Sequence, residues 1–479
     1  MTILHSLTAS TRRPLRSVEF NIAAAQRGLV PLDARLLCIG TKLAAGTATA
    51  ETPTEVFDEA DADAKFGKSS AVALMLRFAM KAARAYGKSP RFFGAGVAEP
   101  GAGVANAQTI TITGPATASG NLHLRIAGRD IVVGIANSAV QNDIAADLEG
   151  VIDEKVAELP GTAGVATNVV TFTHAAKGEN GGDVLIEVVS KPAGVGVTIA
   201  TSAAGSGVID ITASLDAAEG QDFKFIAIEN HKSADITDLA THLASMWAAT
   251  TKRFRFAFVG GRASLATQQA LASAADDFKV VQITAENFPL LPGEMAAGIA
   301  AIRAGEDDPA LHINELELGW CPLPLSDADL PTDAEIESAI AGGMTILTAN
   351  AARTKAMTSR VVTTKVTHAS VPFYALLDVT IPLSMVYAAQ QVDIAQALAT
   401  AQQRNKKKTQ GTKDRVRSVT YAKLKQIEEL EIIQNVDAHA GELTVEDDPV
   451  VVERIVTAIP TSVVPILNQI ANVINLIQE

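Results

Sequence analysis

The chain has 479 residues, of which 48% are hydrophobic, so it carries enough apolar material to fold and is too long for one small core. We expect two to four domains. The formal net charge of −13 argues against general nucleic-acid binding, which needs a basic surface.

The N-terminal part predicts an extended arm followed by the start of an α/β domain. Within the arm, residues 1–30, the apolar side chains of Val18, Phe20 and Ile22 alternate with polar ones as in a strand. Next come a short buried strand, a helix and a second strand, predicted at 34–40, about 69–86, and 90–96.

Residues 101–215 are rich in Gly, Thr, Val and Ala and contain few aromatic side chains. Six segments alternate apolar and polar residues with period two, and glycine-rich turns bound them: 110–113, 122–126, 130–133, 169–173, 184–189 and 195–199. One helix is predicted at about 142–158. This pattern predicts a self-contained β-rich domain.

Strands and helices then alternate again. Continuous apolar runs, typical of parallel strands buried on both faces, lie at 223–228, 254–260, 278–284 and 313–318. Helices are predicted between them at about 235–249, 265–275 and 293–304. We predict one doubly wound α/β domain, formed by residues 31–100 and 216–345, with the β-rich domain of residues 101–215 inserted into it.

The last third predicts a C-terminal α+β domain, residues 346–460. Its elements are paired strands at 360–368 and 375–380, a helix at about 383–403, a basic break at 404–415, a helix to about 433, and a strand at 450–459. Residues 461–479 then form an apolar C-terminal arm. The overall fold class predicted is therefore α/β and α+β multidomain with extended terminal arms.

The apolar C-terminal arm is predicted to be docked, because a run of Ile, Val and Leu is costly to leave in water. Three partners are open for this arm: its own domain, a neighbouring subunit or an aggregate. The spacing of its apolar residues is helical, whereas Ile, Val and Asn favour strands over helices. The residues concerned are Ile466, Ile470, Val473, Ile474, Leu476 and Ile477.

A search for chemistry finds no motif that predicts an enzyme. The chain contains no Gly-x-x-x-x-Gly-Lys-Ser/Thr phosphate loop, no Gly-x-Ser-x-Gly elbow and no His-Glu-x-x-His pair. Adjacent carboxylates such as Asp276-Asp277 fall at expected helix ends, where acids act as caps. We predict no catalytic residue, no cofactor and no metal site.

Two further absences define the expected environment. No secretory leader and no apolar run of about 18 residues is apparent, so we expect a soluble protein made in a cytoplasm, without membrane insertion. Cys38 and Cys321 are far apart in the sequence, and each lies in an apolar stretch, so two buried thiols are predicted.

The concentrated positive patch of the sequence comprises Arg404, Lys406, Lys407 and Lys408, followed by Lys413, Arg415 and Arg417. It can be interpreted as a solvated loop or as an electrostatic contact with an acidic protein surface. Nucleic acid is less favoured, because no aromatic side chains interleave with the lysines.

Several motifs in a fixed order resemble the contractile tail sheath family of phages, in its Mu-like branch. The matching segments are Ile112-Thr-Gly-Pro through Arg129, Pro192-Ala-Gly-Val-Gly-Val-Thr-Ile, Asp308-Pro-Ala through Gly319, Glu337 through Leu347, and Arg360-Val-Val-Thr-Thr. Their order and spacing extend over about residues 15–479. The chain departs from the family pattern at Lys365, where an aromatic residue often stands.

The resemblance implies a structural protein rather than an enzyme. Subunits of this family form six-fold rings stacked around a tail tube, and they shorten to drive the tube through the host envelope. The implied partners are further copies of the chain, the tail tube protein, and baseplate and tail terminator proteins, with no nucleic acid. The implied location is the contractile tail of a virion, assembled in a bacterial cytoplasm.

The resemblance also implies roles for particular residues. The N-terminal arm, through Val18, Phe20 and Ile22, and the C-terminal arm would extend to neighbouring subunits and complete their sheets by strand addition. For the tube contact we favour the helix at 383–403 with the cations Arg404, Lys406, Lys407 and Lys408, a basic run without a counterpart in the family pattern.

Three other interpretations remain open at this level. The first is the sheath of a phage-derived machine such as a tailocin or a type VI-like system. The second is another self-assembling shell or adhesin. The third is an α/β hydrolase.

Overall fold

The computed structural model describes residues 34–229, 232–284, 286–369, 371–401 and 408–465. These residues form two compact units. The core unit comprises residues 34–387, and the C-terminal unit comprises residues 388–464. Helix α9, Thr380–Ala401, begins in the first unit and ends in the second.

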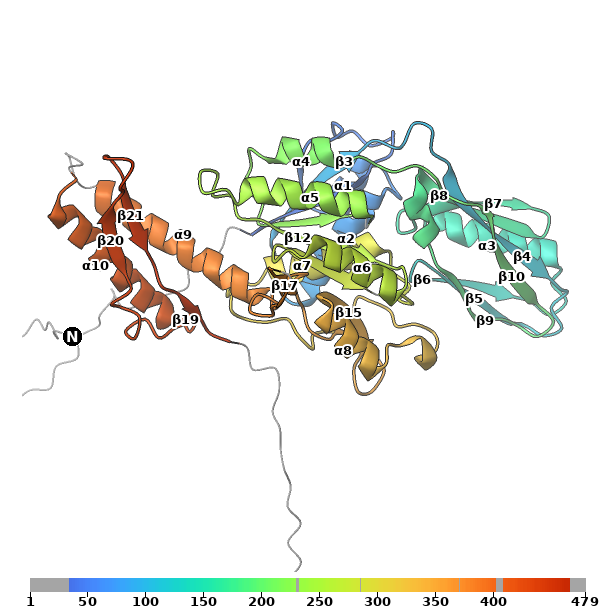
Figure 1. Ribbon diagram of the computed structural model, residues 1–479. Helices are drawn as coiled ribbons and strands as arrows, with labels where there is room; N and C mark the ends of the chain where they lie inside the picture. The colour runs from blue at the N-terminus through green and yellow to red at the C-terminus, as the bar shows by residue number, and fades with distance from the viewer. Residues whose placement is uncertain (1–33, 230–231, 285, 370, 402–407, 466–479) are drawn as a thin grey trace, which may run out of the picture. The chain divides into compact units, whose positions relative to one another are not determined.

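The core unit is built on a nine-stranded sheet whose six central strands are parallel (Figure 1). An antiparallel strand lies at one edge and two more lie at the other. In spatial order the strands are β14 (Glu317–Leu318), β16 (Ala356–Thr358), β15 (Met344–Ala349), β13 (Val280–Thr284), β12 (Phe256–Gly261), β11 (Phe225–Ile228), β1 (Arg35–Thr41), β3 (Arg91–Val97) and β2 (Thr54–Val56).

The central strands are apolar on both faces because helices cover both faces. In β1 the side chains of Leu36 and Cys38 enter one hydrophobic cluster, and those of Leu37 and Ile39 enter the cluster on the opposite face. Helices α2 and α7 contribute to the first cluster, and helices α4 and α5 to the second. This explains why the sequence shows continuous apolar runs here instead of alternation.

Short polar signals set the helix ends. Ser70 caps α2 by accepting a hydrogen bond from the backbone N–H of Ala73, and Thr332 with Glu335 forms a capping box on α8. The helices of the sheet domain are α1 (Glu59–Phe66), α2 (Ala71–Ala85), α4 (Thr212–Ala218), α5 (Ser233–Met246), α6 (Leu265–Ala275), α7 (Pro292–Ala304) and α8 (Asp333–Ala341).

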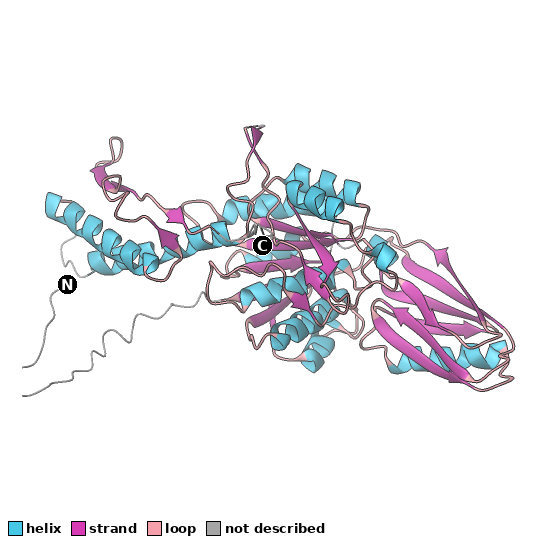
Figure 2. Cartoon of the chain, turned by 90° about the horizontal axis from the view of Figure 1, so that it is seen from below, coloured by secondary structure: helices cyan, strands magenta, loops and turns pink. Residues whose placement is uncertain are grey.

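Between β3 and α4 the chain forms two further sheets, a four-stranded one of order β10-β4-β8-β7 and a three-stranded one of order β6-β5-β9. Helix α3 packs along one side of them (Figure 2). The elements are β4 (Ala105–Thr113), β5 (Gly120–Ile126), β6 (Arg129–Ile135), α3 (Gln141–Glu154), β7 (Gly161–Ala166), β8 (Val169–Lys177), β9 (Ile186–Ser190) and β10 (Gly196–Ala203). Alternate residues of β4, β6 and β8 are buried, which matches the period-two pattern.

The C-terminal unit has two long helices and two small antiparallel sheets. Its elements are the end of α9, then α10 (Gln410–Glu428), β19 (Ile433–Gln434), β20 (Thr444–Asp447), β21 (Ile455–Ala458) and β22 (Ser462–Val463). Strand β20 pairs with β21, and β19 pairs with β22. Strand β20 packs on α10, whose inner face buries Val416, Thr420 and Leu424.

The mixed α/β character matches the prediction, but four predicted elements are wrong in extent or type. Only Glu317–Leu318 of the predicted strand at 313–318 is a strand, and it pairs antiparallel with β16. Glu315 has a left-handed backbone with φ of 55°, which interrupts the extended segment before it. The predicted pair of 360–368 with 375–380 reduces to one bridge, Val362 with Asp378. Helix α10 ends at Glu428 rather than near 433, and the strand predicted at 450–459 is confined to β21.

The threonines of the 360–368 segment account for its lost strand. The backbone N–H of Thr363 donates to the carbonyl oxygen of Leu377 at 2.7 Å. The hydroxyl of Thr363 donates to the carbonyl oxygen of Leu376 at 2.8 Å. The hydroxyl of Thr364 donates to the carbonyl oxygen of Asp277 at 3.0 Å. These bonds replace the regular ladder of a β-pair.

Candidate assembly surfaces and pockets

Most of the predicted contact residues lie outside the described residues. This holds for the N-terminal arm residues Val18, Phe20 and Ile22, for the tube-contact residues Arg404, Lys406 and Lys407, and for the C-terminal arm residues Ile466, Ile470, Val473, Ile474, Leu476 and Ile477. Lys408 is described. The structure therefore informs on the surfaces that adjoin these segments.

The chain that leads into the C-terminal arm is held by its own unit. Strand β22 pairs antiparallel with β19, matching Val463 with Ile433 and Ser462 with Gln434. The backbone N–H of Val464 also donates to the carbonyl oxygen of Ile432 at 3.3 Å. The first residues of the predicted arm thus form a strand within the C-terminal unit.

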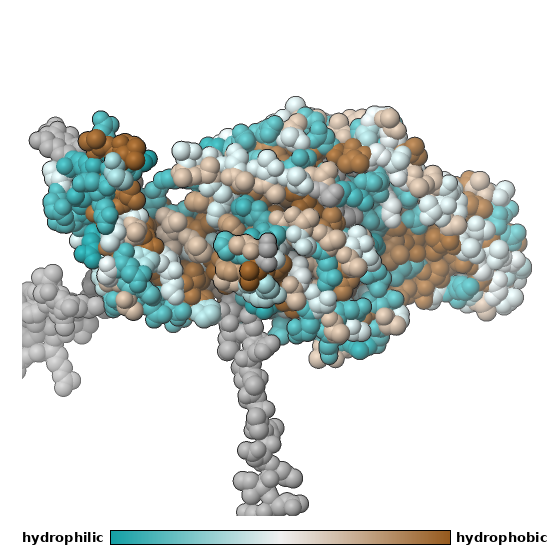
Figure 3. Space-filling view, viewed as in Figure 1, coloured by the Kyte–Doolittle hydropathy of each residue, from teal (hydrophilic) through white to brown (hydrophobic). Residues whose placement is uncertain are grey.

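The β20–β21 hairpin of the C-terminal unit exposes apolar side chains at its tip. Val450 and Val452 are each 83% exposed, and Val456 on β21 is 47% exposed. A hydrophobic patch is visible at this tip (Figure 3). Among the described residues no third strand pairs with this hairpin, and a two-stranded sheet is marginally stable by itself.

Asp448 holds the tip of this hairpin in one conformation. Its Oδ1 accepts hydrogen bonds from the backbone N–H groups of Val450 and Val451, each at 2.8 Å. Its Oδ2 accepts one from Nε of Arg454 at 2.7 Å. These bonds, led by the one from Val451, lower the pKa of Asp448 below its ordinary value. The exposed valines are therefore presented on a fixed loop.

The described part of the basic run contacts the acidic stretch of its own unit. The Nζ atoms of Lys408 and Lys413 lie 3.1 Å and 3.2 Å from the carboxylate of Asp447, and these bonds lower the pKa of that carboxyl group. Lys408 also donates to the carbonyl oxygen of Val452 at 2.6 Å. Lys408 therefore connects the predicted tube-contact segment to the tip of the β20–β21 hairpin.

Helix α9 carries exposed apolar side chains within the C-terminal unit. Ile394 is 53% exposed and Leu398 is 63% exposed, whereas Val392 and Ala399 are buried. The buried side of α9 faces α10. The side-chain amide of Gln396 on α9 donates a hydrogen bond to the hydroxyl of Thr420 on α10, at 2.8 Å. One side of α9 thus exposes apolar side chains shortly before the basic run in the sequence.

In the core unit, an ion pair joins the inserted sheets to the α/β sheet domain. Arg129, the first residue of β6, forms a two-pronged pair with Glu294 in the first turn of α7, with N···O distances of 2.9 Å and 2.5 Å. Only 8% of Arg129 and 1% of Glu294 are exposed. The guanidinium group also lies over the ring of Phe78, 4.7 Å from its centroid.

Further contacts close this junction. Arg125 donates to the carbonyl oxygen of Leu323 at 2.9 Å, and the hydroxyl of Ser69 donates to that of Val156 at 2.5 Å. A Cβ atom on Gly128 would lie 2.8 Å from a methyl group of Leu290. No sequence pattern predicted this junction, although Arg129 is the last residue of a segment that resembles the tail sheath family.

Two of the motifs that carry the resemblance have structural roles. The Asp308-Pro-Ala turn is held by Arg303, which is 1% exposed and donates to the carbonyl oxygens of Asp308 and Leu311 at 2.7 Å and 2.5 Å. Burial lowers the pKa of Arg303 to about 10, so it remains charged at neutral pH. Arg360, in the Arg-Val-Val-Thr-Thr segment, forms two bonds of 2.7 Å with the carboxylate of Asp378.

Asp276, predicted only as a helix-end acid, organises a whole segment. It ends α6 with a φ of 37°, and its carboxylate accepts bonds from Lys365, from the backbone N–H groups of Val366 and Thr367, and from the hydroxyl of Thr367. Burial opposes ionisation, but these bonds together lower the pKa of Asp276. Lys365, which departs from the family pattern, is thereby paired at 3.0 Å.

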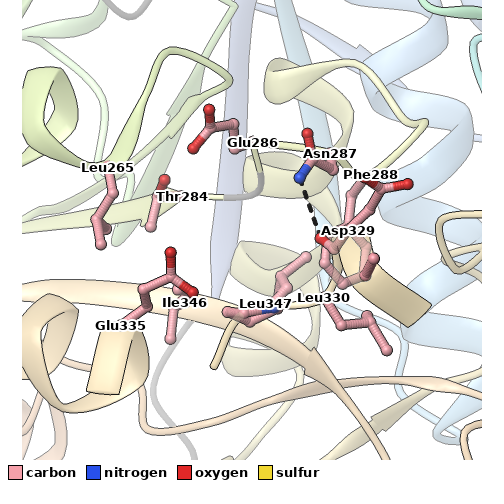
Figure 4. Close-up of a pocket in the computed structure, with 12 residues that line it drawn as sticks. Leu265, Thr284, Glu286, Asn287, Phe288, Asp329, Leu330, Glu335, Ile346 and Leu347 are labelled. Atoms are coloured by element: carbon pink, nitrogen blue, oxygen red, sulfur yellow. Dashed lines mark hydrogen bonds between the residues drawn. The ribbon is translucent and has the colours of Figure 1, made fainter. Parts of the chain in front are cut away.

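A pocket of about 100 Å³ opens at the carboxyl ends of β13 and β15 (Figure 4). Leu265, Thr284 and Glu286 line one side, and Asn287, Phe288 and Asp329 line the other, with Glu335, Ile346 and Leu347 below them. A volume of this size is below the roughly 300–1,000 Å³ typical of cofactor sites.

The place where doubly wound sheets usually bind ligands is filled by the protein itself. Strand β1 lies between β3 and β11, so the chain runs from β1 to β3 on one side and later continues from β11 on the other. In doubly wound folds, ligands bind at the carboxyl ends of the strands at such a switch point. Here the carboxylate of Glu229 accepts bonds from the backbone N–H and hydroxyl of Thr41 at 2.6 Å and 2.8 Å. The remaining cavity is about 20 Å³ and is bordered by Pro160 and His174 of the inserted sheets.

Other reactive groups are buried in structural contacts. Cys38 and Cys321 are free and buried, which raises the pKa of both thiols. Burial, with Arg255 close by, lowers the pKa of His242 to about 4, and its Nε2 lies 2.7 Å from the Arg255 guanidinium. Within the part of the chain that the structure describes, no group of three His, Cys, Asp or Glu side chains is arranged to hold a metal ion.

None of the helices in the described ranges is both long enough and apolar enough to cross a membrane.

Comparison with known proteins identifies relatives of one kind. The chain is 25% identical over 355 residues to the Mu-like prophage FluMu tail sheath protein of Haemophilus influenzae, an alignment that covers 72% of this chain and 71% of the relative. No protein-family model matches the chain. The predicted resemblance to Mu-like tail sheath proteins is therefore confirmed.

The structural comparison agrees on the fold. A sheath tail protein from Listeria innocua superposes with a TM-score of 0.51 and 14% identity, over 88% of this chain and 90% of that one. The helical sheath of the anti-feeding prophage in its contracted state gives a TM-score of 0.49 and 11% identity, over 98% of this chain and 100% of that one. The chain shares the fold of the Listeria protein.

Proposed function

We propose that this chain is the structural subunit of a contractile tail sheath. It polymerises as stacked hexameric rings around a tail tube and contracts to drive the tube through the host cell envelope. The observation that carries the proposal is the relationship to the FluMu tail sheath protein over 72% of the chain. The subunit belongs to the tail of a virion, and a phage-derived injection machine of the same type is equally compatible.

The test is electron microscopy of the purified full-length protein. A sheath subunit assembles into hollow, striated tubes of uniform diameter. Compact particles of one or a few subunits under all assembly conditions contradict the proposal. A parallel assay with a panel of hydrolase substrates tests the structural role, which predicts no turnover.

The absence of an enzymatic role is supported by the filled ligand-binding place of the sheet. The carboxylate of Glu229 is bonded to Thr41, and the space above it holds about one water molecule. A substrate would have to displace both Glu229 and the inserted sheets. The same α/β scaffold then serves as a rigid block for assembly.

The proposed domain organisation divides the chain into five parts. Residues 1–30 are an N-terminal arm, residues 31–100 with 216–345 the sheath core, and residues 101–215 an inserted outer domain. The predicted C-terminal α+β domain, residues 346–460, is proposed in the shorter form 388–460, because β15 and β16 pair within the core sheet, and residues 461–479 are a linking arm. The junction of Arg129 with Glu294 supports an inserted domain that moves together with the core.

The two arms join neighbouring subunits by strand addition. The β20–β21 hairpin supports this, since β21 has an unpaired edge among the described residues and its neighbouring loop exposes Val450 and Val452. The donors are Val18, Phe20 and Ile22 of the N-terminal arm and Ile466, Ile470, Val473, Ile474, Leu476 and Ile477 of the C-terminal arm.

Deletion of residues 466–479 tests the C-terminal linkage and leaves β22 intact. The truncated protein is expected to stay folded, with an unchanged circular dichroism spectrum, and to form no tubes. Deletion of 461–479 also removes β22 and serves as the more disruptive comparison. Tubes of normal appearance from the shorter deletion contradict the linkage.

The tube contact is assigned to helix α9 with the basic run Arg404, Lys406, Lys407 and Lys408. The exposed side chains of Ile394 and Leu398 on α9 support an apolar contact beside the charges. The other partners follow from the same proposal and are the baseplate and tail terminator proteins at the two ends of the sheath.

Substitution of Lys406 and Lys407 by Gln is expected to weaken co-sedimentation with tube polymer and to leave sheath self-assembly intact. Lys413→Gln is the matched control, because Lys413 is already paired with Asp447. The difference in tube co-sedimentation between the double variant and wild type should shrink as salt rises from 50 to 500 mM. Salt screens the attraction between exposed charges that are separated by about a Debye length. Equal tube binding at every salt concentration contradicts the contact.

A further inference from the structure

The pocket at the carboxyl ends of β13 and β15 combines an apolar floor with an acidic rim (Figure 4). Phe288, Ile346 and Leu347 are buried and form the floor. Glu286, Asp329 and Glu335 are exposed at the rim. Hydrogen bonds from the backbone and hydroxyl of Thr332 lower the pKa of Glu335, so its carboxylate stays ionised at neutral pH.

This combination suits one long cationic side chain. The volume of about 100 Å³ accepts a single side chain rather than a cofactor. An aliphatic stem would lie on the apolar floor while its charged end meets the rim carboxylates. Arginine fits best, because its planar guanidinium group donates several hydrogen bonds to carboxylates in a fixed fork.

The sequence contains a segment of matching chemistry outside the described residues. Thr11-Arg12-Arg13-Pro14-Leu15-Arg16 carries three arginines within five positions, directly before the predicted strand of the N-terminal arm. The chain as a whole is acidic, with a net charge of −13, and its other basic run, residues 404–417, is already assigned to the tube contact. Charge complementarity therefore selects this segment as the occupant of the pocket.

The arm joins the core at the end of the sheet opposite the pocket, and the proposed sheath function takes the arm to a neighbouring subunit. Strand β1 is parallel to the strands of the pocket, and the chain enters it at Arg35, at the amino ends of the parallel strands. The pocket lies at the opposite ends, one strand length of about 23 Å away. The 18 residues from Ser17 to Ala34 span up to about 60 Å when extended, enough to reach a neighbouring molecule.

We propose that one arginine among residues 12–16 of a second copy of this chain binds in the pocket lined by Glu286, Asp329 and Glu335. This proposal rests on the proposed sheath function, in which the N-terminal arm extends to a neighbouring subunit. It gives that arm an ionic anchor on the core of the neighbour, next to the strand-forming residues Val18, Phe20 and Ile22.

Disulfide cross-linking between two full-length variants tests the proposal. One variant carries Arg13→Cys and the other Glu286→Cys, and the two are mixed and oxidised. The native Cys38 and Cys321 are buried and do not compete. Peptide mass spectrometry is expected to find the disulfide between positions 13 and 286. Glu154→Cys, an exposed acidic position on α3, replaces Glu286→Cys in the matched control. This control is expected to give at least tenfold less disulfide with position 13.

Each outcome decides the proposal. A 13–286 disulfide joining two different copies supports it. A yield no higher than that of the position 154 control overturns it. A chain that carries both cysteines and, diluted in excess wild-type protein, still forms the disulfide within itself also overturns it.

The same samples separate this proposal from the sheath function. Electron microscopy of wild-type protein reports tube formation, whereas the cross-link needs only two copies in contact. Tubes without the cross-link overturn the pocket contact and leave the sheath function standing. A cross-link without tubes under any assembly condition supports the contact and counts against the sheath function.

Discussion

Breaking the ion pair between Arg129 and Glu294 should destabilise the core unit strongly. Glu294→Gln keeps the size of the side chain but leaves a guanidinium group, 8% exposed, without its counter-charge. Loss of one partner of a buried ion pair costs about 3–5 kcal/mol. Glu294 also accepts a hydrogen bond from the backbone N–H of Leu291 at 3.2 Å, which the amide can retain. We therefore expect a decrease of about 3 kcal/mol in the free energy of unfolding.

Urea unfolding followed by tryptophan fluorescence measures this loss. Both tryptophans, Trp247 and Trp320, lie in the core unit, so the signal reports the unit that contains the pair. Arg129→Met in the same background tests the coupling. The double variant should lose less than the sum of the two single variants, since an apolar side chain on the ring of Phe78 needs no counter-charge.

The surface pair of Arg91 with Glu55 provides the control. It has a similar N···O distance of 2.8 Å, but the Arg91 side chain is 49% exposed. Glu55→Gln should therefore lower the free energy of unfolding much less than Glu294→Gln does. If Glu294→Gln costs no more than Glu55→Gln, the pair does not hold the inserted domain on the core, and the argument from burial is wrong.

Two further perturbations test other contacts of the core unit. Gly298→Ala in α7 should lower the free energy of unfolding by about 1–2 kcal/mol, because the added Cβ would lie 2.4 Å from the ring of Trp320, whereas Gly150→Ala in α3 meets nothing within 4 Å and should raise it by about 0.5–1 kcal/mol. Equal effects of the two alanines in urea unfolding would contradict the packing around Trp320. The pKa of Asp276 is lower in the folded protein than in the unfolded chain, where it is about 3.9. Its contribution to the free energy of unfolding is therefore complete above the unfolded-state pKa and is lost as pH falls through the folded-state pKa. Asp276→Asn should therefore flatten the dependence of stability on pH below about 4, as measured by thermal unfolding of the variant and of wild type. An unaltered slope in Asp276→Asn would show that Asp276 does not anchor residues 365–367.

The sequence predicted the elements that depend on local pattern. The runs at 223–228 and 278–284 contain β11 and β13, the run at 254–260 overlaps all but the last residue of β12, and the helix predicted at 265–275 matches α6. Continuous apolar runs and regular spacing record which side chains must leave water, and that requirement is the same in any tertiary context. The order of the motifs also carried the resemblance to tail sheath proteins.

Local pattern could not predict which partner a buried side chain meets. The segment at 313–318 is apolar enough for a parallel strand, but β15 pairs with β13, and Glu317–Leu318 pairs with β16. Nothing in the neighbouring sequence of Arg129 indicates Glu294, 165 positions away. Contacts of this kind depend on how distant elements pack.

Gly298 shows the difference in a single residue. Helix propensity alone predicts that alanine at this position would stabilise α7 by about 1 kcal/mol. The tertiary structure places the ring of Trp320 where the added carbon would go, which reverses the expected sign. The sequence by itself thus determined which segments are helices, strands and apolar faces, because these follow from the chain's own periodicity. Only the tertiary structure decided which charges pair and which glycines must stay small, because these depend on residues brought together from distant parts of the chain.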